Sequence, residues 1–174
     1  MRIDDNALGP SRPMDPKEVA FCRKTEAILI KEPEMQYADI VRAYREIEEE
    51  FVNHAGYDDW EVLETKRRIA ESIFRAACDS EQPFDVCRDN WNTLVELGFS
   101  SIEMFSTMTW FYADCCLLHE QNEIGLALVE PLIAELETAL ADPACTEQAA
   151  RFYNQELRPL RELRDELEGP LRSP

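Results

Sequence analysis

The residues best suited to metal or acid–base chemistry in this chain are its two histidines and the acids and thiols beside them. His54 follows Glu50 by four residues, and His119 follows Cys115 by four, so each pair would share one face of a helix. A zinc site built on Cys115, His119 and two distant ligands is one interpretation. A helix-end imidazole beside a buried thiol is the other, and we expect no metal site.

The spacing of the other potentially catalytic residues gives little support for an enzyme. A di-iron carboxylate bundle needs Glu-x-x-His twice, but Phe51 stands three residues before His54 and Cys116 stands three before His119. The chain has no glycine-rich phosphate loop and no nucleophile elbow. The acids Asp58 and Asp59 are typical of a helix start, where they cap free N–H groups. We therefore predict a protein that is not an enzyme, with no catalytic residues and no cofactor.

The strongest signal in the sequence is a long stretch of one-signed charge within a net charge of -18. Between Arg75 and Arg151 the one basic residue is Arg88. The same stretch holds the apolar run from Ile102 to Leu118, so its acids should decorate a packed core. Such a surface attracts basic partners and repels nucleic acids and anionic membranes. The fourteen acids are Asp79, Glu81, Asp85, Asp89, Glu96, Glu103, Asp114, Glu120, Glu123, Glu130, Glu135, Glu137, Asp142 and Glu147.

From this stretch we select candidate partner-binding residues. Carboxylates would provide electrostatic steering, and reversing Glu120, Glu123 and Glu130 together should slow association with a basic partner. Tryptophans are candidate anchors because large rigid rings lose little entropy at an interface, although we expect only about one of the three to be exposed. The candidates are Asp85, Asp89, Glu96, Glu103, Glu120, Glu123, Glu130, Trp91 and Trp110.

Apolar residues recurring at three- and four-residue spacing predict an all-α protein of about seven antiparallel helices. We expect one helical domain over 15–169, preceded by a flexible arm at 1–14 and followed by a tail at 170–174. Gly56 marks the end of the second helix, and Pro131 should kink or break the sixth. The expected helices cover approximately 15–31, 37–54, 58–81, 84–98, 100–118, 123–140 and 146–167.

Cysteine usage and the N-terminal residues favour a cytoplasmic protein. The chain has six cysteines but no signal sequence, and it is long enough to build its own core, so we expect reduced thiols without disulfides. The apolar run from Ile102 to Leu118 is too short for a comfortable bilayer crossing. It is expected to form a central, buried helix.

One segment resembles a known repeat family. Ala70-x-x-x-Phe74-x-x-Ala77, followed by Pro83, is similar to the second half of a tetratricopeptide repeat (TPR). The resemblance covers about a third of the chain. It implies a TPR-like stack of helical hairpins that binds other proteins through a concave face. A compact helical bundle is the alternative arrangement.

The charge and the helical pattern together favour a non-enzymatic, acidic protein-binding module. Its partner would be a basic protein: a toxin or effector held by an immunity protein or inhibitor, or a secreted substrate held by a chaperone. The alternatives are a helical-repeat scaffold that binds through an apolar groove, a nucleic-acid mimic, and an enzyme in which His54 and His119 converge. Direct nucleic-acid or membrane binding is not expected, and the sequence does not indicate an oligomeric state.

Overall fold

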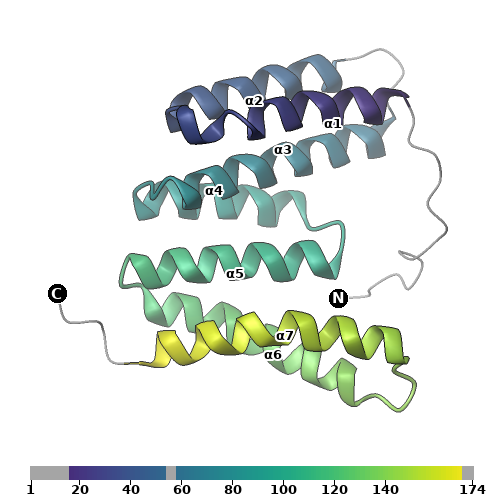
Figure 1. Cartoon of the computed structure of the whole chain (residues 1–174), viewed down its shortest axis with the longest axis vertical. Helices are drawn as coiled ribbons and strands as arrows, with labels where there is room; N and C mark the ends of the chain where they lie inside the picture. The colour runs from purple at the N-terminus through teal and green to yellow at the C-terminus, as the bar shows by residue number, and fades with distance from the viewer. Residues whose placement is uncertain (1–15, 54–57, 170–174) are drawn as a thin grey trace. The chain divides into compact units, whose positions relative to one another are not determined.

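The computed structural model describes residues 16–53 and 58–169 (Figure 1). Within these ranges the chain forms seven α-helices and one short 3-10 helix and contains no strand, which confirms the predicted all-α class. The predicted arm at 1–14, the tail at 170–174, His54 and Gly56 lie outside the described residues. The elements are α1 (Pro16–Leu29), η2 (Glu32–Glu34), α2 (Tyr37–Val52), α3 (Asp59–Asp79), α4 (Phe84–Leu97), α5 (Ile102–Leu118), α6 (Asn122–Ala141) and α7 (Glu147–Glu168).

The described chain divides into two compact units. The first unit comprises 16–53, 58–82 and 89–101, and the second comprises 83–88 and 102–169. Helix α4 therefore begins in the second unit and ends in the first. The expectation of one domain over 15–169 stays a prediction.

The first unit is built on the amphipathic helix α2, which packs against both α1 and α3 (Figure 1). The ring of Phe51 meets Phe21 of α1 edge to face, with centroids 5.3 Å apart. Tyr44 is buried, and its hydroxyl donates a hydrogen bond to Glu32 at 2.6 Å. The buried residues of α2 recur at three- and four-residue spacing, so one apolar side of this helix enters the core. This core holds Phe21, Ile40, Tyr44, Ile47, Phe51, Ile69, Ile73 and Ala76.

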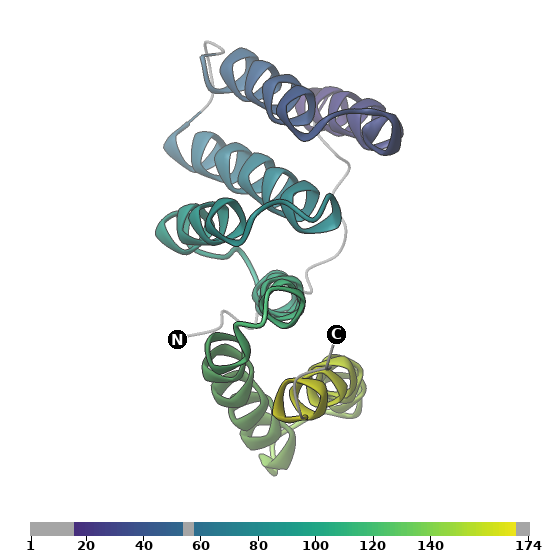
Figure 2. The same ribbon diagram turned by 90° about the vertical axis from the view of Figure 1, so that its left-hand side faces the viewer.

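In the second unit, α5 contacts both α6 and α7, which also pack along each other (Figure 2). Apolar side chains surround most of α5, as the sequence predicts, so several of its sides need cover from water. Each of these two helices gives one face to the core, and the exposed residues of each include glutamates. Their shared core comprises Ala113, Val129, Leu132, Ile133, Leu136, Leu157, Leu160, Leu163 and Leu167.

Helices α3 and α5 end in the same turn. Glu81 and Glu120 both adopt a positive φ, of 50° and 58°, where glycine is the usual residue. Each is followed by a glutamine whose backbone N–H donates to a carbonyl five residues earlier, at 3.0 Å for Gln82 and 2.7 Å for Gln121. The side chain of each glutamine also donates to a carbonyl two residues earlier. Two helices thus end in matching Glu-Gln turns, which sequence comparison alone did not show.

Capping and proline geometry account for two further helix features. Asp58 accepts a hydrogen bond from the backbone of Glu61, whose side chain accepts one from the backbone of Asp58. This reciprocal pair confirms Asp58 as a cap.

Helix α6 continues through Pro131, so the predicted break does not occur there. Pro159 likewise lies inside an uninterrupted α7.

A buried hydroxyl in α5 yields a stability prediction. Thr109 is 1% exposed, and its Oγ1 has no hydrogen-bond partner in the described structure. Thr109→Val keeps the side-chain shape and removes the unsatisfied group, so it should raise the free energy of unfolding by about 1 kcal/mol. Thr107→Val is the matched control, because Thr107 is exposed on the same helix. Urea unfolding of both variants tests this, and equal effects would contradict the assigned cause.

Candidate protein-binding surface

The outer side of α6 is the least neutralised acidic surface of the second unit. Its exposed glutamates that form no ion pair are Glu123, Glu130 and Glu135, and the small residues Ala127 and Ala134 are also exposed on this helix. We call these five residues the α6 acidic face. Neither α5 nor α6 contains a lysine or an arginine. In the described structure, none of the three glutamates forms an ion pair.

Arginines lie nearby in the sequence, but each of them already forms an ion pair with a carboxylate. Every arginine in 102–169 lies on α7, and three of the four pair with acids of α7 itself. Only Arg161 reaches α6, where it contacts Glu137, outside the α6 acidic face. The pairs are Arg151–Glu147 at 2.6 Å, Arg158–Glu162 at 3.1 Å, Arg161–Glu137 at 2.7 Å and Arg164–Asp165 at 2.7 Å.

Packing of the inner side of α6 fixes which side remains outside. Gly125 lies where α6 approaches its neighbours most closely: a Cβ there would stand 2.9 Å from Leu167 and 3.3 Å from Cys116. Nearby, Asn122 donates a hydrogen bond to the carbonyl of Leu167 at 2.8 Å. These contacts hold the start of α6 against α5 and α7. They turn the glutamates of the α6 acidic face toward solvent.

Two exposed apolar residues stand close in sequence to the α6 acidic face. Leu118 ends α5, and Ile124 lies in the first turn of α6. The turn between them contains Glu120. A partner surface here would therefore meet apolar side chains as well as charge, which is the usual composition of a protein interface.

The predicted acidic residues do not form one surface within a single unit. Asp85, Glu103, Glu120, Glu123 and Glu130 belong to the second unit and are exposed. The other two, Asp89 and Glu96, are also exposed but belong to the first unit. Glu135 was in the acidic stretch but not among the candidates, because the sequence does not show which side of α6 is buried.

The tryptophan candidates require a correction. Trp91 is 6% exposed, with its ring 5.9 Å from Phe74 and 5.8 Å from Phe99, so it belongs to the core of the first unit. Trp110 is half-buried against the core of the second unit. Trp60, which was not among the candidates, is 59% exposed. The expectation of about one exposed tryptophan is confirmed, but for a different residue.

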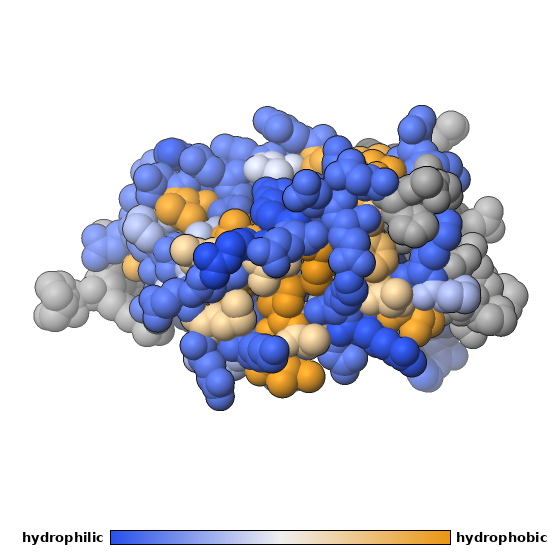
Figure 3. All heavy atoms as spheres, turned by 90° about the horizontal axis from the view of Figure 1, so that it is seen from above, coloured by the Kyte–Doolittle hydropathy of each residue, from blue (hydrophilic) through white to orange (hydrophobic). Residues whose placement is uncertain are grey.

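The face formed by α1 and α2 differs from the α6 acidic face. Viewed over these helices, the surface is mostly hydrophilic with scattered apolar groups (Figure 3). Its charges have both signs and pair with each other: Lys24 contacts Glu50, and Arg42 contacts Asp39 at 2.5 Å. Glu50, the acid proposed to share a metal with His54, is thus held in a surface ion pair.

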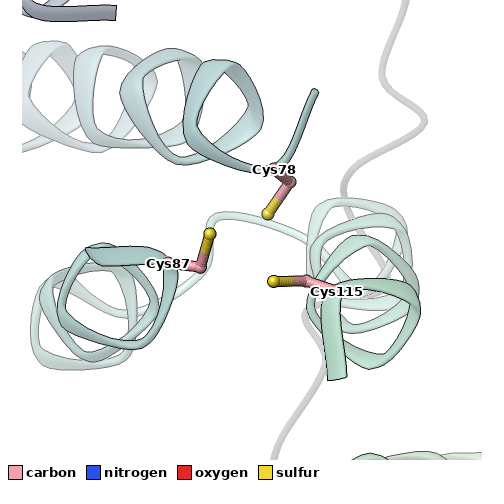
Figure 4. A group of neighbouring side chains, drawn as sticks. All are labelled: Cys78, Cys87 and Cys115. Atoms are coloured by element: carbon pink, nitrogen blue, oxygen red, sulfur yellow. The ribbon is translucent and has the colours of Figure 1, made fainter. Parts of the chain in front are cut away.

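The arrangement of the thiols differs from the one expected for a zinc site built on Cys115 and His119. None of the six cysteines, all of which lie in the described residues, is part of a disulfide bond. Cys115 is buried, and its Sγ lies within 4.8 Å of Cys87 Sγ on α4 (Figure 4). His119 is half-buried, with its ring 5.8 Å from that of Phe84. Within the second unit, the potential metal ligand that lies beside Cys115 is therefore another thiol.

Comparisons of this chain with protein-family models, curated proteins and solved structures found no match. Among the described residues, no helix combines the length and apolarity that a membrane crossing requires. The role of the α6 acidic face must therefore be inferred from its own geometry and charge.

The acidic surface also includes one carboxyl group whose titration the fold alters. Burial, and secondarily the negative charge of Glu166 on α7, raise the pKa of Asp114 above its ordinary value of 3.8. The folded chain therefore retains this proton to a higher pH than the unfolded chain does. Asp114 consequently lowers folded stability as the pH rises through that interval.

Replacing Asp114 by Asn should remove this loss. We expect the stability gain of Asp114→Asn over the natural chain to grow as the pH rises from about 4 to about 7. Glu103→Gln, at an exposed position of the same helix, is the control for removing one negative charge. Urea unfolding at several pH values is the measurement. Gains that rise in parallel for both variants would contradict the assignment to Asp114.

Proposed function

We propose that this protein is a non-enzymatic binding module that holds a basic protein against the α6 acidic face. The observation that carries this proposal is the set of three exposed glutamates on α6, Glu123, Glu130 and Glu135. Neither α6 nor its neighbour α5 contains a lysine or an arginine. The arginines of α7 are already engaged with other carboxylates. A partner that brings lysines or arginines therefore supplies the missing positive charge.

The expected contribution of this charge is mainly to association rate and partner choice. A single exposed ion pair contributes only about 0–1 kcal/mol. Several carboxylates of one sign instead create a field that accelerates encounter with a basic surface and disfavours acidic ones. Affinity then needs apolar burial, which Leu118 and Ile124 are placed to provide.

Two biological uses fit this surface. An immunity protein or inhibitor would cover the basic surface of a toxin or effector, and a chaperone would hold a basic secreted substrate. Both require an acidic face with an apolar component, and both leave catalysis to the partner. The inhibitor use follows more directly, because electrostatic steering makes capture of a toxic partner fast.

A helical-repeat scaffold is the second candidate, and the matching turns after α3 and α5 favour it. Repeated helical hairpins present extended surfaces built from equivalent helices. In that case specificity would come from an apolar surface, and binding would depend weakly on salt. The TPR-like resemblance stays a prediction.

The proposed function is tested by cross-linking from within the α6 acidic face. A photo-reactive amino acid replaces Ala134 and is activated in cells that produce the protein, and captured proteins are identified by mass spectrometry. The captured partner should be basic. Reversing the charges of two of these glutamates with Glu130→Lys and Glu135→Lys should reduce its capture by more than about tenfold, because attraction becomes repulsion.

The matched control reverses two exposed acids on the first unit, Glu46→Lys and Glu49→Lys, and changes the net charge equally. This control should capture the partner as the natural chain does. A probe at Asn154, exposed on α7, reports whether capture is specific to the α6 acidic face. An acidic captured protein, or equal losses in both double variants, would refute the proposed function.

A further inference from the structure

Two buried thiols of the second unit form an arrangement that protein binding does not explain. Cys87 on α4 is 0% exposed, Cys115 on α5 is 2% exposed, and their sulfur atoms lie within 4.8 Å of each other. Figure 4 shows both thiols directed toward a common point from their two helices. Because each thiol is carried by a regular helix, their separation is set by helix packing.

The sulfur separation suits a shared metal ion. Thiolates bind metals such as zinc at about 2.3 Å, so two sulfurs on one ion stand at most roughly 4.6 Å apart. The observed upper bound of 4.8 Å is close to this limit, so an ion would require little movement of either helix. Neither thiol is part of a disulfide bond, so no disulfide competes for them.

The donor set selects the kind of ion. A structural zinc site needs four ligands, and His119 does not join the thiols, since its ring lies against Phe84 instead. Soft thiolates without nitrogen or oxygen donors favour Cu(I). We propose that Cys87 and Cys115 bind one Cu(I) ion as thiolate ligands. On binding, each thiol releases its proton to solvent, two Cu–S bonds form, and no redox change occurs.

The surroundings suit such a complex. The Phe84 ring stacks on Tyr112 with centroids 6.0 Å apart, at an interplanar angle of 7°, and these rings help to exclude water. Two thiolates and one Cu(I) carry one net negative charge, and Arg88 follows Cys87 directly.

An ion can reach these thiols although they are buried. Cys87 lies in the first turn of α4, and Cys115 lies in the last turn of α5. Terminal turns open more readily than helix centres, because part of their backbone lacks intrahelical hydrogen bonds. Local opening of either end would expose a thiol without unfolding the core. This inference is independent of the proposed protein-binding function.

The test is an anaerobic titration of the full chain with Cu(I) in competition with a coloured Cu(I) chelator. The natural chain should bind one Cu(I) tightly. Replacing a group that only positions a metal ligand weakens metal binding by about 10–100-fold. Because Cys87 and Cys115 are the proposed ligands themselves, Cys87→Ala and Cys115→Ala should each weaken Cu(I) binding by more than about 100-fold. Retention of the tight site in either variant would overturn the proposal.

Three control variants are available. Cys116→Ala removes the buried thiol next to Cys115, which is not among the thiols that the proposal assigns as ligands. Cys22→Ala and Cys145→Ala remove half-buried thiols elsewhere. These three should keep the tight site, and its loss in any of them would contradict the assignment.

X-ray absorption at the copper edge keeps the proposal testable if a variant fails to fold, because it uses the natural chain. The expected copper environment contains sulfur ligands only. Nitrogen or oxygen ligands around the bound copper would overturn the proposal. Far-UV circular dichroism identifies the variants that retain their helices.

Discussion

The arrangement of the second unit depends on covering α5, an apolar helix that water cannot solvate well on most of its sides. Burial of apolar surface contributes roughly 25 cal/mol per Å² and is the main force available to a chain that also carries a net charge of -18. Helices α6 and α7 provide this cover, and each gives up one face to do so. Their remaining faces must be polar, and those faces determine what the unit presents to partners.

The distribution of cations decides which of these polar faces keeps its charge. On α7, arginines and acids alternate at helical spacing and neutralise each other within the same helix. On α6, acids occur without cations, and the single arginine that crosses from α7, Arg161, meets Glu137. The α6 acidic face therefore results from sequence composition on one helix and from ion pairing on its neighbour. A partner would meet concentrated charge on α6 and balanced charge on α7.

Sequence periodicity predicted the helices well because it reports directly on which sides of a helix are apolar. The stripe of α2 and the apolar circumference of α5 both became core, and Asp58 became a cap. Periodicity does not report how far a neighbouring helix extends over a stripe. Trp91, a candidate anchor, is buried against Phe74 and Phe99, whereas Trp60 in the first turn of α3 is exposed.

The candidate site was less predictable because it depends on pairs of distant residues. The acidic stretch was evident, but only the fold shows that Glu137 is paired with Arg161, whereas Glu123, Glu130 and Glu135 are exposed without an ion pair. The thiols of Cys87 and Cys115 are far apart in sequence, so no local spacing indicated them. The matching turns share only a Glu-Gln dipeptide, which is too short to identify without backbone geometry.

The central claim is that the α6 acidic face is the binding surface for a basic partner. The most direct measurement is an NMR titration of the full chain with a lysine-rich amphipathic helical peptide, at low and at high salt. The account predicts that backbone amide shifts change mainly around Glu123, Glu130 and Glu135 at low salt, and that high salt reverses these changes. Changes centred on α7 or on the first unit, or changes unaffected by salt, would contradict it.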